Sequence, residues 1–592
     1  MTVSIPDRVL AAAFAGCLLF GALPAHAQTE VDNQPLLIIP MGDAELLGGT
    51  SADPSTGGSG LVVETLEPVS ADAAGTLDAA SGGFGMGLWD GSDAQLVAIL
   101  MPRLPGGTGS EVGTDLGRRL LLSAARAPEG ESGDLLGWRI DRLIALGLQN
   151  KVPELIGSAG QRALTPFGHK GRVDALLLAG EHERACRAAE EAVLAGDETE
   201  MALTLIYCQR LEGKDAAADL GLTILQDTGA EIDPRFLTLD RALKQAEPAS
   251  VESFQDASPL LFAMALSTGA RLSPDLLASA PVPFLRAVAV HEYLPLETRL
   301  FAAEIAVAAG AMSGAELAEL YQSATFSTDQ IANALSRADT TTGPLGRALL
   351  FQAAGRQALP AGRAEALAAM LRHADAENGP AGFLSAARAA GPMIASVAPG
   401  SELSWFAGDA ATALLAAGMP EAGARWWPLL ENHARNDTVA AAQYAALWPM
   451  FRLAFGEQLP DDGTNMRRWW DASARLAPDR VAQQAEVYLA LFAALDDRAG
   501  SILVVEAIAT PPTQDSAEGD PSLSGVLLAF DEAVADRRLG EAVLLALIAL
   551  GPEGPAGANP LVLRNVVGSL KELGLGREAR LIALEAAFAN GI

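Results

Sequence analysis

The sequence predicts an all-α protein built from a long series of helices, and three observations support this fold class. From Trp89 onward, alanine and leucine dominate over valine and isoleucine, and apolar residues recur three and four positions apart. Clusters of Gly, Pro, Asp and Asn interrupt the chain roughly every 15 to 20 residues, which is typical of helices of ordinary length joined by short turns. No stretch of alternating polarity around an Asn-Gly turn indicates a pair of strands.

The N-terminus has the pattern of a secretory signal peptide. A positive charge precedes the apolar run 9–23, and small residues follow at positions 25 and 27. This pattern predicts a signal peptide over residues 1–27, cleaved between Ala27 and Gln28. A lipid-modified Cys17 is an alternative, but the apolar run continues well past it. Because the run is shorter than the about 20 apolar residues of a membrane span, we expect a periplasmic or secreted protein with no membrane span.

Residues 28–87 have the composition of a disordered acidic leader. No Lys or Arg occurs between Gln28 and Pro102, and Gly, Ser, Ala and Asp are frequent. Such a composition buries too little apolar surface to offset the entropy of ordering, roughly 1–2 kcal/mol per residue. Two apolar islands, 36–39 and 61–63, are candidates to dock on the protein's own body or on a partner.

The charge balance excludes one class of partner. The chain has 41 basic and 73 acidic residues, a net charge of −32. Nucleic acid binding depends on Lys and Arg that neutralise phosphates, so we expect no nucleic acid partner. Anionic lipid surfaces are disfavoured for the same reason. Basic proteins or peptides, cations and neutral glycans stay open as partners.

One helical hairpin can be assigned closely. A helix over 183–195 is expected to end at Gly196, with Asp197 as N-cap of a second helix that stops at Gly213. The segment 180–185 places a turn glycine five positions before a helix alanine. The segment 213–218, which begins 33 residues later, has the same form, and so does the segment 574–579.

This spacing resembles the turn and second helix of tetratricopeptide repeats, whose period is about 34 residues. The aromatic and proline positions of the full repeat are missing. The resemblance implies an α-solenoid of antiparallel helical hairpins over residues 88–510 and 522–592, with a possible seam at 511–521. Stacked hairpins cover apolar faces that no single hairpin can bury.

The two cysteines of the mature chain lie on the expected hairpin. Cys186 is ten residues before Gly196 and Cys208 is twelve residues after it. At 1.5 Å per residue these positions lie about 15 and 18 Å from the turn, so their heights nearly match. In an oxidising compartment this predicts a Cys186–Cys208 disulfide, with two buried thiols as the alternative.

Tryptophans form a second periodicity at intervals of 21 or 22 residues. An interval of one helix plus its turn gives a hairpin unit of about 43 residues, within the range of longer helical repeats. Indoles at helical positions can belong to the core or line a glycan-binding groove. The residues of this possible binding surface are Trp405, Trp426, Trp427, Trp448, Trp469 and Trp470.

The sequence contains no catalytic, metal-binding or cofactor-binding motif. His291 lacks the second histidine of a zinc-protease helix, and the loop 461–465 is explained by a helix cap without a calcium ion. A pair of carboxylates on facing helices, as in glycosidases, stays open as an alternative.

Residues 116–123, 139–147 and 205–213, together with the Cys186 hairpin, resemble a group of uncharacterised alanine-rich exported proteins of proteobacteria over about residues 89–290. The resemblance implies a helical body and an envelope location, with no known activity. We therefore expect an exported scaffold that binds a protein or peptide partner and has no catalysis of its own. The alternative is a cell-envelope glycan-binding protein or hydrolase that uses the Trp-rich region 405–470.

Overall fold

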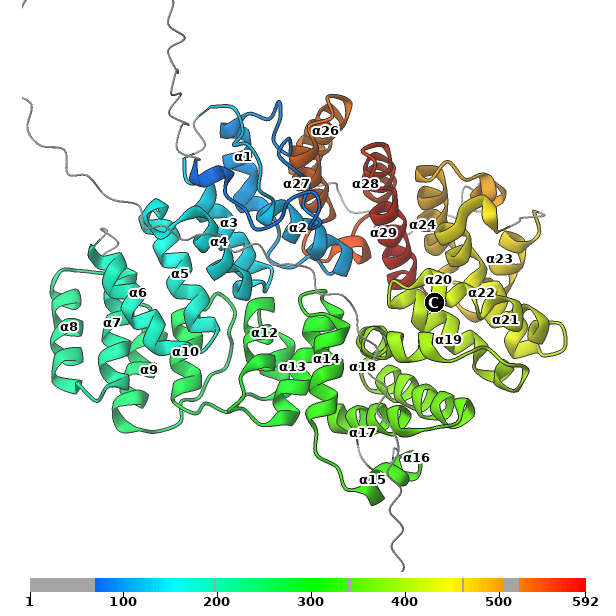
Figure 1. The fold of residues 1–592 in the computed structure, drawn as a ribbon, viewed down its shortest axis with the longest axis horizontal. Helices are drawn as coiled ribbons and strands as arrows, with labels where there is room; N and C mark the ends of the chain where they lie inside the picture. Colours follow the sequence, from blue (N-terminus) through cyan, green and yellow to red (C-terminus); the bar gives the residue numbers. More distant parts are fainter. Residues whose placement is uncertain are drawn as a thin grey trace, which may run out of the picture. The chain divides into compact units, whose positions relative to one another are not determined.

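The structure is a computed structural model that describes residues 70–130, 133–194, 199–337, 340, 342–459, 463–503 and 521–591 (Figure 1). Within these residues the regular secondary structure is helical, and the only strand-like pairing is two isolated β-bridges. The all-α prediction is therefore confirmed for the described chain. The signal peptide, the apolar islands, the Asp197 cap and most of the 511–521 seam lie outside the described residues.

The first half of the chain forms the helices α1 (Ala94–Leu100), α2 (Glu111–Leu122), α3 (Leu135–Ala145), α4 (Val152–Ala159), α5 (Pro166–Leu178), α6 (His182–Leu194), α7 (Thr199–Leu211), α8 (Asp215–Asp227), α9 (Pro234–Gln245), α10 (Pro259–Ser267), α11 (Pro274–Ala278), α12 (Val282–Val290), α13 (Leu296–Ala308) and α14 (Gly314–Ser323).

The second half forms α15 (Thr328–Ala332), α16 (Ala334–Arg337), α17 (Gly343–Arg356), α18 (Pro360–Ser396), α19 (Ala407–Ala416), α20 (Pro420–Ala424), α21 (Trp427–Ala434), α22 (Thr438–Phe455), α23 (Asn465–Leu476), α24 (Val481–Ala494), α26 (Pro521–Ala535), α27 (Leu539–Leu550), α28 (Pro560–Glu572) and α29 (Gly576–Ala589). Short 3-10 helices join them: η1 (Ala71–Ala73), η2 (Met101–Arg103), η3 (Gln149–Lys151), η4 (Gln161–Ala163), η5 (Ser401–Phe406), η6 (Gly456–Gln458), η7 (Arg498–Leu503) and η8 (Gly554–Ala556).

Local sequence explains where many helices begin. Thr165, Ser258 and Ser273 each accept a hydrogen bond from the backbone N–H three residues later, and each is followed by proline at the first helical position. A polar N-cap satisfies an N–H that the helix leaves unpaired, and proline lacks the N–H that would be unpaired there. Ser313 goes further, since it forms a reciprocal capping box with Glu316.

The long helix α18 is two helices joined at a kink. Gly379 has φ 58° and ψ −149° inside it, and Pro380 follows at once. Proline cannot donate the next helical hydrogen bond, and glycine accepts the positive φ at little cost. The second part of α18 therefore takes a new direction, and its residues 380–388 reach the cavity described below.

Consecutive helices pack on each other along much of the chain. Such contacts join α5 to α6, α6 to α7, α7 to α8, α12 to α13, α17 to α18, α21 to α22 and α22 to α23. Their buried faces are mainly alanine and leucine, as in α27, where Ala542–Leu547 are all buried. Small alanine side chains let helix axes approach closely, so each pair buries apolar surface that neither helix could hide alone.

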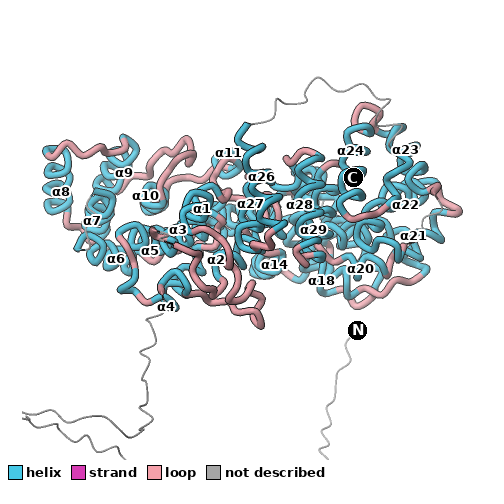
Figure 2. Tube along the Cα trace, turned by 90° about the horizontal axis from the view of Figure 1, so that it is seen from above, coloured by secondary structure: helices cyan, strands magenta, loops and turns pink. Residues whose placement is uncertain are grey.

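The last helices do not simply continue this succession. Figures 1 and 2 both show α26–α29 between the early helices α1 and α2 and the later helices α22–α24. The contacts agree, because α27 packs on α1 and α2, and α29 packs on α2, α19, α22 and α24. In a linear array each repeat contacts only its neighbours, so contacts between helices this far apart in sequence do not occur. The C-terminal helices therefore join regions that are more than 300 residues apart in sequence.

The predicted leader boundary at residue 87 is wrong, because residues 70–87 are folded against the helical body. The backbone N–H of Thr76 donates to Leu122 O at 2.8 Å, and that of Ala124 donates to Leu77 O at 2.8 Å. The buried guanidinium of Arg139 donates to Ala74 O at 2.6 Å and to Asp72 O at 3.2 Å.

Glycine in this segment reflects close backbone packing. A Cβ added at Gly75 would lie 2.2 Å from the backbone nitrogen of Ala124. Only glycine fits such an approach without a backbone shift. The Gly-rich composition of residues 70–87 therefore reflects close packing against the helical body and not disorder.

No helix in the described part of the chain is long and apolar enough to cross a membrane. The apolar stretch from Ala542 to Leu547 is a buried part of α27.

Candidate functional site

The tryptophans of the repeated spacing are mostly core residues. The indoles of Trp426, Trp427, Trp448 and Trp469 are buried, Trp470 is half-buried, and Trp405 alone of the six is largely exposed, at 42%. Of the two interpretations of these indoles, core or glycan-binding groove, the burial of these four tryptophans favours the core.

Aromatic packing explains why these indoles are buried. Trp427 stacks on Tyr444 with ring centroids 4.4 Å apart, and it lies at the same distance from Phe451. Trp469 meets Tyr488 edge to face at 5.0 Å. Such pairs are worth about 0.5–1.5 kcal/mol beyond the burial of their area. The indoles thus join α21, α22, α23 and α24 from within.

A groove lies on the outside of the same helices. It has a volume of about 720 Å³ and runs between the end of α21, the first half of α22 and α23. Thr438, Ala441 and Ala445 line it from α22, and Arg468, Ala472 and Arg475 line it from α23. Both sets follow the three- and four-residue spacing of one helix face. We call this feature the α21–α23 groove.

The α21–α23 groove has arginines at its rim. Arg435 is paired with Glu431 at 3.4 Å, but both side chains are exposed, so this ion pair is weak. Among the described residues, the Arg468 side chain reaches only Asn465, at 3.4 Å. Arg475 makes no hydrogen bond or ion pair with any residue that the structure describes. With Glu431 and Asp471 as the two acids, the charged residues of the groove sum to +1, whereas the chain carries −32.

A second, more enclosed cavity lies where α2, α18, α19 and α29 meet. Its volume is about 450 Å³. Val112, Leu384, Leu581 and Phe588 provide apolar wall, and Glu585 carries a carboxylate there. Carboxylates in an apolar cavity are candidates for acid–base catalysis, so their partners matter.

The partners of Glu585 show a structural role. Its carboxylate accepts hydrogen bonds from Ser110 Oγ, from the backbone N–H of Glu111 at 3.0 Å and from Arg388 Nη2 at 3.1 Å. Burial raises the pKa of Glu585, and the positive charge of Arg388 opposes this shift. A carboxylate at a helix N-terminus is stabilised by the unpaired N–H groups and by the helix dipole. Glu585 therefore caps α2 from α29.

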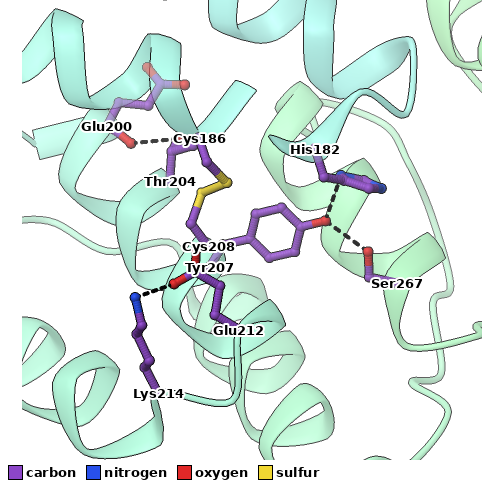
Figure 3. Close-up of a disulfide and its surroundings, with 9 residues drawn as sticks. All are labelled: His182, Cys186, Glu200, Thr204, Tyr207, Cys208, Glu212, Lys214 and Ser267. Atoms are coloured by element: carbon purple, nitrogen blue, oxygen red, sulfur yellow. Dashed lines mark hydrogen bonds and ion pairs between the residues drawn. A yellow bond between two sulfur atoms is a disulfide. The ribbon is translucent and has the colours of Figure 1, made fainter. Parts of the chain in front are cut away.

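The disulfide is formed as the sequence predicted. Cys186 on α6 and Cys208 on α7 are bonded, with Cα atoms 5.9 Å apart (Figure 3). Beside it, the Tyr207 hydroxyl lies 3.0 Å from His182 Nδ1 and 2.8 Å from Ser267 Oγ. Burial raises the pKa of Tyr207 to about 12 and lowers the pKa of His182. Both groups are thus neutral at pH 7, and their hydrogen bonds join α6, α7 and α10.

The described residues contain no group of three or more His, Cys, Asp or Glu side chains arranged to hold a metal ion. Sequence reasoning missed the α21–α23 groove. The signal was present, since Arg468, Arg475 and Leu476 lie at helical spacing on one short segment. The neighbouring Trp469 and Trp470 give the same segment an equally strong apolar pattern.

No family model, curated protein or solved structure matches the chain.

Proposed function

We propose that this chain is an exported helical-repeat scaffold that binds a protein or peptide partner and has no catalysis of its own. In this proposal its helices form a tetratricopeptide-like α-solenoid of antiparallel hairpins, and the C-terminal helices α27 and α29 pack back on the first helices of the array. A signal peptide is removed after Ala27. The packing of consecutive helices supports the repeat architecture. The disulfide supports an oxidising compartment, because such bonds are rare in reducing ones.

The observation that carries the binding proposal is the α21–α23 groove. Its rim holds two adjacent exposed side chains that the described fold does not use. Arg475 makes no hydrogen bond or ion pair within the described chain, and Leu476 is 80% exposed. Large exposed apolar residues next to unpaired charges are typical of interaction surfaces. A structural role would instead bury or pair these groups.

The test is affinity capture from an envelope extract with the full mature chain as bait. Ala442→Arg fills the groove from an exposed position on α22, and Ala217→Arg is the matched control on the exposed face of α8. We expect a specific partner that the wild type and Ala217→Arg retain and that Ala442→Arg loses. A partner that all three proteins retain equally would refute the assignment of this groove.

A further inference from the structure

We infer that the α21–α23 groove binds an acidic peptide that carries apolar side chains, and this inference rests on the proposed binding function. The groove offers two kinds of contact, one for carboxylates and one for apolar groups. Each is carried by a different set of residues.

The carboxylate contacts come from the three arginines. Arg435, Arg468 and Arg475 are exposed and line the groove from two different helices, since Arg435 directly follows α21 and the other two lie on α23. Guanidinium binds carboxylate in a planar, bidentate arrangement, which a single lysine cannot reproduce. Arginines from two different helices therefore suit a ligand that presents several carboxylates along its length.

Charge complementarity favours an acidic ligand over a basic one. The chain has 73 acidic residues, so a surface chosen without regard to function has an excess of carboxylates. The α21–α23 groove has the reverse, with three arginines against Glu431 and Asp471. The distant negative charge is screened over about 8–10 Å at physiological ionic strength, whereas contacts inside the groove are not. The local excess of arginine thus decides which ligand fits.

The apolar contacts separate a peptide from a small anion. Ala434, Ala441, Ala445 and Ala472 line the groove with small side chains, and Leu476 lies at its margin. Small residues leave room for the side chains of a ligand, and about 720 Å³ is more than an inorganic anion fills. An acidic peptide with leucine-like residues satisfies both sets of contacts at once.

A second copy of this chain is a less favourable occupant. Any segment of it that reaches the groove brings the −32 charge of its own chain close to the first copy. Such self-association is opposed by like-charge repulsion. It is nevertheless one outcome of the experiment below.

The experiment uses three fluorescein-labelled amphipathic peptides of about five helical turns. All have leucine at helical spacing, and the remaining positions are Glu, Gln or Lys. Fluorescence anisotropy with the full mature chain at physiological ionic strength gives the affinity of each. We expect the Glu peptide to bind about tenfold more tightly than the Gln peptide, and the Lys peptide to bind most weakly.

Variants locate the site. Arg468→Gln/Arg475→Gln should weaken binding of the Glu peptide about tenfold and leave the Gln peptide unchanged. Arg187→Gln, an exposed arginine on α6, is the matched control and should change neither. A thermal melt of each variant checks that the fold is kept.

Several results overturn the inference. If the Glu and Gln peptides bind equally, or if none of the peptides binds, recognition of an acidic peptide is wrong, although the proposed function stands as long as Ala442→Arg still loses a captured partner. If the Glu peptide binds equally to the double variant, the groove is not its site. If light scattering gives a dimer that Ala442→Arg abolishes, the occupant is a second copy.

Discussion

The contact between α29 and the start of α2 gives the sharpest test of how the fold is held together. Glu585 lies 475 residues after Ser110, yet its carboxylate accepts from the Ser110 hydroxyl and from the first N–H groups of α2. It also binds Arg388, whose side chain is only 4% exposed. The substitution Glu585→Ala removes all of these acceptors together.

The magnitude follows from what is left unpaired. Arg388 keeps its hydrogen bond to Val307 O at 2.6 Å and its ion pair with Glu111, but the Glu111 carboxylate is 45% exposed and contributes little. Breaking a buried ion pair on one side costs about 3–5 kcal/mol. Because burial raises the pKa of Glu585, the ionised carboxylate is already costly, and we take the low end, about 3 kcal/mol.

Hydrogen exchange measured by mass spectrometry reports this locally. A loss of about 3 kcal/mol in local opening corresponds to about 100-fold faster exchange of the amides at the start of α2. Glu585→Gln keeps an acceptor for the N–H groups and should give a smaller effect. Amides in α9, which has no contact with this junction, serve as the internal control. Unchanged exchange at the start of α2 in a folded Glu585→Ala protein would refute the reasoning.

Three further predictions concern other sites. Reducing the α6–α7 disulfide should lower local stability by about 3 kcal/mol, seen as faster exchange of both helices, and alkylation of the native protein should find no free thiol there. Burial lowers the pKa of His182 and His291, so protonation favours the unfolded chain, and stability should fall as the pH drops below about 6.5. Melting temperatures of wild type and His182→Gln over this range check it, and coincident curves would contradict it. Gly314→Ala should lower the melting temperature, because its Cβ would lie 2.2 Å from Arg388 O, whereas Gly525→Ala on α26 meets nothing within 4 Å and should be neutral or stabilising.

The sequence contained enough information for the helices and the disulfide because both are set by local spacing. The α6–α7 hairpin was predicted over 183–195 with a stop at Gly213, and the helices are His182–Leu194 and Thr199–Leu211. Helical periodicity and turn residues act over four to six positions, so a single sequence reveals them. The cysteine pairing followed from the same hairpin and the rise per residue.

Long-range contacts were not accessible in this way. Nothing near Glu585 in sequence indicates that it caps a helix beginning at Glu111. Likewise, residues 70–87 are folded against the body partly through Arg139, whose guanidinium donates hydrogen bonds to backbone carbonyls of that segment. The burial of Arg139 lowers the pKa of its guanidinium to about 10. Composition describes a segment by itself, whereas this segment is ordered by a partner more than 60 residues away.

The buried arginines of this chain differ in their contacts from the exposed arginines of the α21–α23 groove. Arg139, Arg210, Arg286, Arg347, Arg388 and Arg452 are buried, whereas no lysine is buried among the described residues. A guanidinium has five donors in a fixed plane, so it can bind a carbonyl and a carboxylate together, as Arg286 does with Ala311 O and Glu316.

Buried arginines of this kind bond groups on other helices, so we expect their loss to destabilise the fold. Arg468 and Arg475 make no such contacts with the described residues, so their replacement by glutamine should leave the free energy of unfolding within about 0.5 kcal/mol of the wild-type value. In a chain with 73 acidic and 41 basic residues, arginines that the fold does not use are the candidates for the proposed contacts with a partner. Stability and binding can therefore be separated by which set of arginines is changed.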